Sequence, residues 1–220
     1  SVEDTAVYGR RNLIINGAMQ VWQRSSSNAS ASANTYPAAD RWKFWVNGST
    51  MGTTRTAFTI GQTDVTNIQY YNSISIASNS GTGDYHTINQ HIEDITRFDN
   101  ITVTLSFYAK ASVAWTVGIE PCQNFGSGGS PSSRVLGTPQ TVSVGTSWSR
   151  HEVTLTLPSI SGKTLGTTAH TSNFEIAMWL SAGSDFNSRA GSIGNQSGTF
   201  DITGIQLEVG EQATPFEHRS

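Results

Sequence analysis

The chain has 220 residues, a formal net charge of −3, a sequence pI of about 5.9 and only 13% charged residues, so its surface is expected to be rich in hydroxyl and amide groups. The acidic balance argues against a dedicated nucleic-acid-binding protein, and no apolar run reaches membrane-spanning length, so neither nucleic acid nor membrane insertion is expected. The single cysteine, Cys122, excludes an internal disulfide and a cysteine-rich metal site.

The first patterned segment spans residues 12–23, after residues 1–11, which have no hydrophobic period and are predicted to be an N-terminal linker or arm. Leu13-Ile14-Ile15 is apolar on both faces, as in a central strand, so the segment is predicted to begin as a strand. Asn16-Gly17 signals a turn or bulge. Residues 24–35 contain no core-forming side chain and are predicted to be a long exposed loop.

Apolar and polar residues then alternate in segment after segment, which is the period of half-buried strands. Strands are predicted at residues 40–46, 58–60, 68–77, 85–93 and 101–110. The clearest of these is 101–110, where every odd position is apolar.

The second half of the chain continues the alternation. Strands are predicted at residues 113–119, 140–144, 152–158 and 173–181, with long loops at 123–134 and 183–198. In the last strand Phe200 and Ile202 have one parity and Ile205, Leu207 and Val209 the other. A β-bulge at Thr203–Gly204 would keep both sets in the core.

About ten predicted strands, no convincing helix and no internal repeat indicate an all-β fold. We predict a two-sheet antiparallel β-sandwich of jelly-roll type, because alternation gives each sheet one apolar face to bury against the other. The patterned segments at the two ends, 12–23 and 199–210, are expected to lie near each other. The predicted organisation is a single domain over 12–217 and a C-terminal tail at 218–220.

Motifs at both ends and in the middle of the chain combine in a specific way. They are Asn12–Arg24, Ala39-Asp-Arg-Trp42, Val103–Ala111, Ser147-Trp-Ser-Arg150 with Leu157-Pro158, Phe200–Gly210 and Ala213–Glu217. Together they resemble a recurring domain of tailed-bacteriophage virion proteins, often found in tail fibres, over roughly residues 12–217. The resemblance implies a module made in the bacterial host cytoplasm and exposed on the phage particle. A homotrimer in contact with other virion proteins is implied as well.

More distantly, the same layout resembles jelly-roll carbohydrate-binding modules, which often open with an Asn-Gly-x-Phe-Glu strand and close with an Asp-bearing strand. Met19-Gln20 stands where Phe-Glu would be. Since that Glu tends to serve a structural calcium, the departure leaves a calcium site without support, although Asp201 remains a candidate ligand. No cofactor and no metal are expected.

No catalytic constellation is evident in the sequence. It has no nucleophile elbow, zinc-protease helix, P-loop or dinucleotide glycine pattern. His86 and His91 lie five apart on one predicted strand and therefore point to opposite faces, which disfavours a shared metal. We expect no catalytic residue and no enzyme. A glycan-cleaving enzyme is nevertheless kept as an alternative, ranked third after the two functions given below, because folding can bring two carboxylates together.

Five aromatic residues point away from the apolar set of their strands. They are Trp45, Tyr71, Tyr85, Tyr108 and Trp179. Flat rings stack on sugar faces, and exposed aromatics in number usually have a use, so these residues are the candidate glycan-binding site. Alternatively, they are covered by the long loops or lie in a subunit interface, where Trp and Tyr are enriched.

The preferred function is a phage virion surface module, in a tail fibre or receptor-binding protein, that recognises host surface carbohydrate. The alternative is a non-binding structural virion protein such as a capsid decoration protein.

Overall fold

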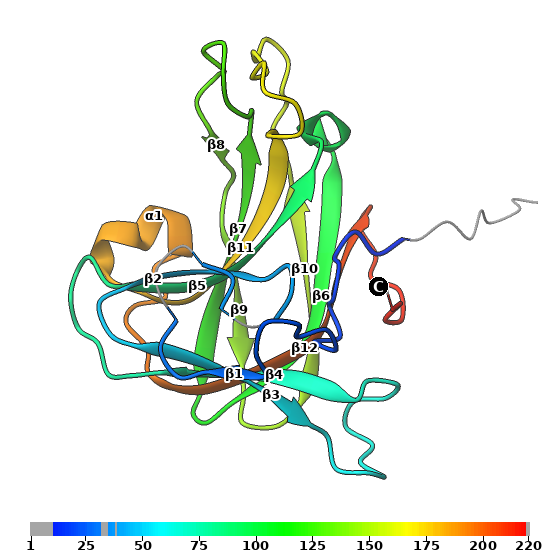
Figure 1. Ribbon diagram of the computed structural model, residues 1–220, viewed down its shortest axis with the longest axis vertical. Coiled ribbons are helices and arrows are strands. Elements are labelled where there is room, and N and C mark those ends of the chain that lie inside the picture. The colour runs from blue at the N-terminus through cyan, green and yellow to red at the C-terminus, as the bar shows by residue number, and fades with distance from the viewer. Residues whose placement is uncertain (1–10, 32–34, 38, 219–220) are drawn as a thin grey trace, which may run out of the picture.

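A computed structural model describes residues 11–31, 35–37 and 39–218. Two antiparallel sheets of six strands each stack face to face (Figure 1), which confirms the predicted all-β sandwich. The described residues outside the strands include only three short helical elements: η1 (Ile95–Phe98), η2 (Ser184–Phe186) and α1 (Asn187–Ala190). None of the helices in those ranges is long enough to cross a membrane. Most of the predicted arm 1–11 and tail 218–220 lies outside the described residues.

The two sheets interleave segments from all parts of the chain. Sheet A has the order β1 (Ser27–Asn28), β3 (Met51–Ala57), β4 (Tyr70–Ile76), β12 (Gly198–Val209), β6 (Thr102–Ala111) and β10 (Ser149–Thr156). Sheet B has the order β2 (Lys43–Asn47), β5 (Tyr85–Glu93), β11 (Asn173–Ala182), β7 (Trp115–Asn124) and β8 (Val135–Leu136), and β9 (Gln140–Val144) also pairs with β7. The core between them includes the fully buried rings of Phe107, Phe174 and Phe200.

The bulge predicted in the last strand is present. The register of β12 on β6 shifts between Thr203 and Gln206, and Gly204 has a φ of 59°. This left-handed conformation favours glycine. A side chain at this position would also meet the ring of Tyr108. Phe200, Ile202, Ile205 and Leu207 are consequently all buried in the core, whereas Val209, predicted to join them, is 63% exposed at the end of the strand.

The strand predicted at Phe58–Ile60 is wrong. The preceding Gly/Thr stretch forms β3 and pairs with β4 along its length. Threonine is β-branched and suits an extended chain, so a segment with few apolar residues still makes a strand once a neighbour supplies its hydrogen bonds. Ile60 lies instead in the following loop and is fully exposed.

The segment 12–23 lies beside β12, but none of its residues belongs to a strand, so that part of the prediction is wrong. The amide of Leu13 donates to the carbonyl of Leu207 (2.8 Å), and the amide of Ile205 donates to Gly17 (3.1 Å). The segment cannot continue as a strand because Met19, like Asn16 before it, has a positive φ, of 54°.

Side-chain amides replace the strand neighbours that this segment lacks. Gln90, only 2% exposed, accepts a hydrogen bond from the amide of Ile15 (2.7 Å) and donates one to its carbonyl (2.9 Å). Asn12 accepts from the amides of Ile14 (2.9 Å) and Leu207 (3.2 Å). A buried peptide group is thereby satisfied at each point where a sheet ladder would otherwise be needed.

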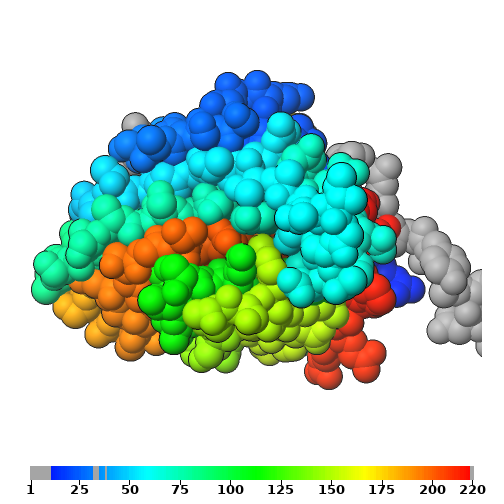
Figure 2. Space-filling view, turned by 90° about the horizontal axis from the view of Figure 1, so that it is seen from below, coloured from blue at the N-terminus to red at the C-terminus, as the bar shows by residue number. Residues whose placement is uncertain are grey.

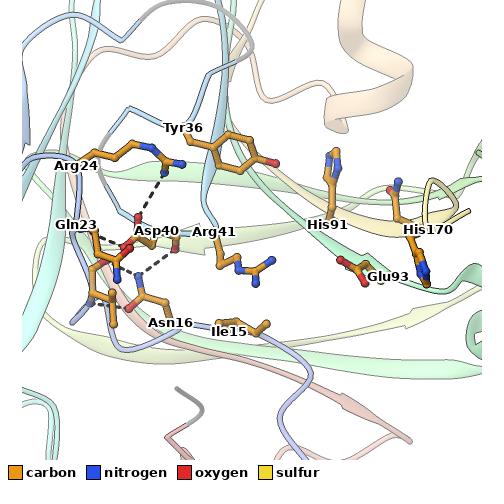
Figure 3. A pocket seen from close by; sticks show the side chains of 12 residues that line it. Ile15, Asn16, Gln23, Arg24, Tyr36, Asp40, Arg41, His91, Glu93 and His170 are labelled. Carbon is orange, nitrogen blue, oxygen red and sulfur yellow. Dashed lines mark hydrogen bonds and ion pairs between the residues drawn. The ribbon is translucent and has the colours of Figure 1, made fainter.

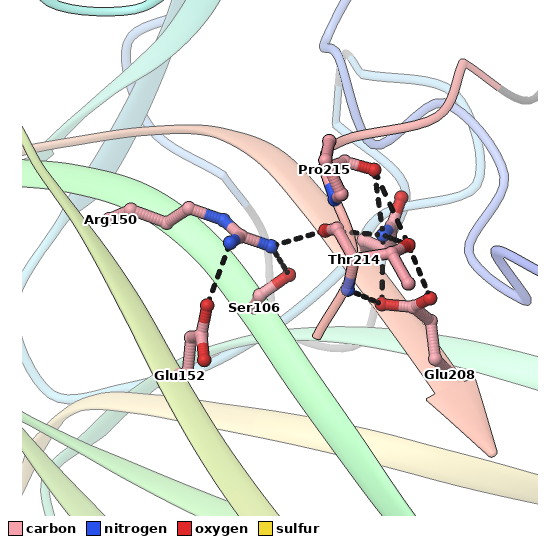
Figure 4. A network of polar contacts seen from close by, with 7 residues as sticks. Ser106, Arg150, Glu152, Glu208, Thr214 and Pro215 are labelled. Atoms are coloured by element: carbon pink, nitrogen blue, oxygen red, sulfur yellow. Dashed lines mark hydrogen bonds and ion pairs between the residues drawn. The ribbon is translucent and has the colours of Figure 1, made fainter. Parts of the chain in front are cut away.

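The end of the chain folds back over the outer face of sheet A as a C-terminal strap, residues 211–217. Glu208, 4% exposed, accepts from the backbone amide (2.9 Å) and the hydroxyl (2.6 Å) of Thr214 and from the side-chain amide of Gln206 (2.9 Å). Arg150 of β10 donates to the carbonyl of Thr214 and to the hydroxyl of Ser106 (Figure 4). A buried carboxylate and a guanidinium thus fix the strap from two sides.

The strap also meets the beginning of the described chain. Asn12 donates to the carbonyl of Glu217 (3.1 Å), and the amide of Arg11 lies 3.4 Å from the Glu217 carboxylate. The two patterned ends of the sequence are therefore side by side, as predicted.

Replacing Gln90 by Met keeps the length of the side chain but leaves the amide and the carbonyl of Ile15 without their partner. We expect the free energy of unfolding to fall by about 2–4 kcal/mol, because each unsatisfied buried group costs about 1–3 kcal/mol. Urea unfolding followed by tryptophan fluorescence measures it. Gln140→Met, at an exposed position of β9, is the matched control and should change stability by less than about 0.5 kcal/mol.

Candidate functional site

A groove of about 620 Å³ opens where the segment 15–24, the residues Tyr36, Asp40 and Arg41 and the ends of β5 and β11 meet. Figure 3 shows Asn16, Gln23, Arg24 and Asp40 on one side and His91, Glu93 and His170 on the other, with Tyr36 and Arg41 reaching between them. The groove therefore combines one aromatic ring with both hydrogen-bond donors and acceptors.

Asn16 holds the floor of the groove in shape. Its side chain, 5% exposed, donates to the carbonyls of Val21 (2.9 Å) and Asp40 (3.0 Å) and accepts from the amide of Val21 (2.9 Å). Asn16 itself has a φ of 55°, which asparagine tolerates better than most residues.

Arg41 occupies a strained position in the groove. Its φ is 72°, in the left-handed region where a residue other than glycine costs about 1–2 kcal/mol. The neighbouring carboxylate of Asp40 is directed away, to Arg24 (3.4 Å) and to the amide of Gln23 (3.1 Å). Within the described ranges no ion pair involves Arg41, so its exposed guanidinium is available to a ligand.

Aromatic rings and cations alternate from the groove across the outer face of sheet B. Arg24 and Lys43 lie 5.8 and 5.9 Å from the centre of the Tyr36 ring. Lys43 and Arg134 lie 6.0 and 5.1 Å from the centre of the Trp45 ring. We call these five residues the cation ladder. Such distances allow a cation to be attracted by the ring quadrupole, so the rings hold the three cations in a row.

A buried carboxylate lies below this ladder. Glu175, 1% exposed, is 3.0 Å from Arg134 and 3.5 Å from the Nε2 atom of His91. Burial raises the pKa of Glu175, and the positive charge of Arg134 opposes that rise. Burial, together with the charges of Lys43 and Arg134, lowers the pKa of His91 to about 4, so His91 is neutral at pH 7.

A second buried carboxylate anchors the third long loop. Glu120, fully buried, accepts two hydrogen bonds from Arg189 of α1 (2.9 and 2.8 Å) and one from the indole of Trp179 (3.1 Å). The guanidinium also lies 4.9 Å from the centre of the Trp179 ring. The bidentate pair draws α1 onto the outer face of sheet B and covers Trp179.

The five aromatic residues predicted as a site do not lie together. On sheet B, Trp45 is half-buried in the cation ladder, whereas Trp179 is 1% exposed and packs with Tyr85 and Phe186 beneath the η2–α1 segment. The loop-covered alternative therefore describes Trp179 and Tyr85, because residues 183–190 fold over the face rather than away from it.

The other two predicted residues lie on the outer face of sheet A. Tyr71 forms an outer aromatic cluster with Phe58 (4.9 Å between ring centres) and Trp148 (5.2 Å), and Phe58 and Trp148 are also 5.2 Å apart. Figure 2 shows the cyan segment that follows β3 resting against the yellow-green chain of β9 and β10. Tyr108 packs nearby, in a small apolar cluster with Ile68. The sandwich separates these rings from the groove.

No described group of three or more His, Cys, Asp or Glu residues could hold a metal. Asp201, the candidate calcium ligand, lies 3.7 Å from the ammonium of Lys110 and is 9% exposed. Burial, followed by the charge of Glu120, raises the pKa of Cys122 to about 12, so that the thiol stays protonated at pH 7.

Sequence reasoning found Trp45 but missed the residues that surround it. Tyr36, Arg41 and Arg134 lie in loops or next to very short strands, where no period reveals direction. The motif Ala39-Asp-Arg-Trp42 was the one available signal, since it contains Arg41, but nothing in it predicts a left-handed backbone.

No protein-family model and no curated protein matches the chain. Solved structures do. A CBM4 carbohydrate-binding module is 18% identical, with 90% of this chain and 99% of that one covered and a TM-score of 0.50. A protein from Bacteroides thetaiotaomicron is 14% identical, with 91% and 100% covered and a TM-score of 0.51. The enzymatically active domain of tailspike protein 4 of bacteriophage CBA120 is 13% identical, with 82% of this chain and 21% of that one covered and a TM-score of 0.43. At these identities the likenesses establish the fold, a jelly-roll β-sandwich, and nothing finer.

The low pKa of His91 makes a prediction about stability and pH. The unfolded chain binds a proton at His91 near pH 6.5, whereas the folded chain does so only near pH 4, so stability is lost as the pH falls through that window. His91→Gln lacks this titration. The free energy of unfolding of the variant, minus that of the wild type, should therefore rise by on the order of 2–3 kcal/mol as the pH falls from 7 to 4. Chemical unfolding at several pH values measures the difference. A difference between the two proteins that does not vary with pH would contradict the assignment.

Proposed function

We propose that this chain is a carbohydrate-binding module on the surface of a bacteriophage virion, in a tail fibre or receptor-binding protein, and that it binds host surface glycan in the groove. The groove supports the sugar-binding part. Its volume of about 620 Å³ falls within the range of small-molecule sites, and its wall offers amide, carboxylate and guanidinium groups beside one half-exposed tyrosine ring.

The chemistry of the groove suits sugar hydroxyl groups. A hydroxyl both donates and accepts hydrogen bonds, so it pairs equally with the carboxylate of Glu93 and the guanidinium of Arg41. Tyr36, 38% exposed, adds a phenolic hydroxyl at the rim, which also donates and accepts hydrogen bonds. The fold that the chain shares with carbohydrate-binding modules also favours this reading.

A binding role fits the carboxylates of the groove better than a catalytic one. Of the two that line it, Asp40 is engaged by Arg24 and by the amide of Gln23, so Glu93 is not matched by the second carboxylate that glycoside hydrolysis needs. We therefore infer a module that binds without cleaving.

The virion part of the proposal rests on the sequence motifs that resemble phage tail-fibre domains. In this setting the module is made in the host cytoplasm, is exposed on the particle, contacts other virion proteins and forms a homotrimer. A structural calcium is not part of the proposal, because Asp201 is paired with Lys110.

The second candidate is a structural virion protein without a ligand, such as a capsid decoration protein. The outer aromatic cluster favours it, because half-exposed Phe58, Tyr71 and Trp148 gather on one face and such rings are typical of subunit interfaces. A trimer formed through the outer aromatic cluster would leave the groove open, because the groove lies on the other sheet. Both candidate functions are therefore compatible with a trimer.

Light scattering coupled to size exclusion tests the interface. We expect a trimer that Trp148→Ala converts largely to monomers, because truncating a central aromatic residue of an interface typically costs 2 kcal/mol or more. Circular dichroism of the variant checks that it remains folded. A monomeric wild type would contradict the trimer and leave the cluster without this role.

Glycan binding is tested on an array of bacterial surface polysaccharides. Arg41→Gln should weaken binding about tenfold or more, because it removes a charged hydrogen-bond donor from the groove. Arg97→Gln removes the same charge from an exposed position of η1 and is the matched control. Equal binding by the two variants, or no binding by the wild type, would contradict the proposal.

A further inference from the structure

The cation ladder extends from the groove across the outer face of sheet B. It runs from Arg24 at the groove through Tyr36, Lys43 and Trp45 to Arg134, with each cation between 5.1 and 6.0 Å from a ring centre. An exposed ring that served only to stack on a neutral sugar would keep its face open. Here cations lie over both rings, which makes the rings holders of positive charge.

The ladder carries a surplus of positive charge in a chain whose net charge is −3. Its three cations face two carboxylates, Asp40 beside Arg24 and Glu175 beside Arg134, so one positive charge is not neutralised. His91 adds none at pH 7 because its pKa is near 4.

Lys43 is the cation without a carboxylate. The part of the chain that the structure describes places no Asp or Glu oxygen within 4.0 Å of its ammonium, and no hydrogen bond there engages it. The ring quadrupoles of Tyr36 and Trp45 attract the charge but accept no conventional hydrogen bond. Its three N–H donors are therefore left for acceptors from outside the protein.

Polar atoms without partners gather at the same place. Glu175 and Asn89, both at most 1% exposed, each have a side-chain oxygen with no hydrogen-bond partner, and Asn173 and Arg134 contribute further such atoms. These residues share the outer face of sheet B, since Lys43 pairs with Asn89 across β2 and β5. Buried polar atoms normally have hydrogen-bond partners, and the oxygens among these accept rather than donate, so they suit the hydroxyls of a ligand and not its carboxylate.

We propose that the ligand is an acidic saccharide, whose carboxylate is held by Lys43 between the Tyr36 and Trp45 rings while its neutral hydroxyls occupy the groove. This inference rests on the proposed sugar-binding function and names the class of sugar. Charge-assisted bonds are about twice as strong as neutral ones, so Lys43 decides between acidic and neutral glycans.

The test compares each acidic glycan with its own carboxyl-reduced form, which has the same rings and linkages without the charge. Uronic-acid tetrasaccharides and sialylated oligosaccharides, each beside the reduced product, are titrated into the full chain by calorimetry. We expect the acidic form to bind at least tenfold more tightly, with an affinity that falls as salt is added. Lys43→Gln should lower the affinity for the acidic form toward that for the reduced form and so remove the preference.

The matched control is Lys163→Gln, which removes the same charge from an exposed loop position outside the groove. It should keep the preference for the acidic form. Equal binding of acidic and reduced glycans, or a Lys43→Gln variant that still prefers the acid, overturns the inference and leaves sugar binding in place. Binding of neither form, on a glycan array as well as in calorimetry, overturns the proposed function together with the inference.

Discussion

The structure depends on how the buried segment 12–17 is hydrogen-bonded. The left-handed turn at Asn16 prevents a regular strand, so its peptide groups would be unpaired between two sheets, at about 1–3 kcal/mol for each. Gln90 reaches in from sheet B, and Asn12 joins the segment to β12 of sheet A. Through this segment the two sheets are linked by polar bonds as well as by apolar packing. Since Ile15 and Asn16 also form part of the groove, the site and the fold rely on the same few amides.

Much of the sandwich could be predicted because a period of two reports which face a side chain occupies. It gave the inward set of β11 and the bulge at Gly204 correctly. It cannot report what covers the outer face. Ala177 and Trp179 do point outward, yet both are buried because residues 183–190 fold back over sheet B, and the outward Glu175 is buried against Arg134 and His91. A short helix held by one Arg189–Glu120 pair leaves no periodic trace in the sequence.

The candidate site was harder to predict for a related reason. Lys43 and Trp45 lie on β2, and His91 and Glu93 lie on β5. Tyr36, Arg41 and Arg134 come from outside the strands and reach the outer face of sheet B only through folding. A positive φ at an arginine has no sequence signal, and distant residues that share one aromatic ring have none either. The five outward aromatics have three different surroundings. Trp45 lies among cations, Tyr85 and Trp179 lie beneath a loop, and Tyr71 and Tyr108 lie on the opposite sheet.

The meeting of Asn12 with Glu217 has a mechanical consequence. The segment 12–17 runs antiparallel to β12, and the strap returns to it, so the described chain begins and ends at one corner. Tension that pulled residues 11 and 217 apart would load the hydrogen bonds of the strap one after another rather than all at once. Thr214 and its contacts with Glu208 would resist next, and the packed core between the sheets would bear force last.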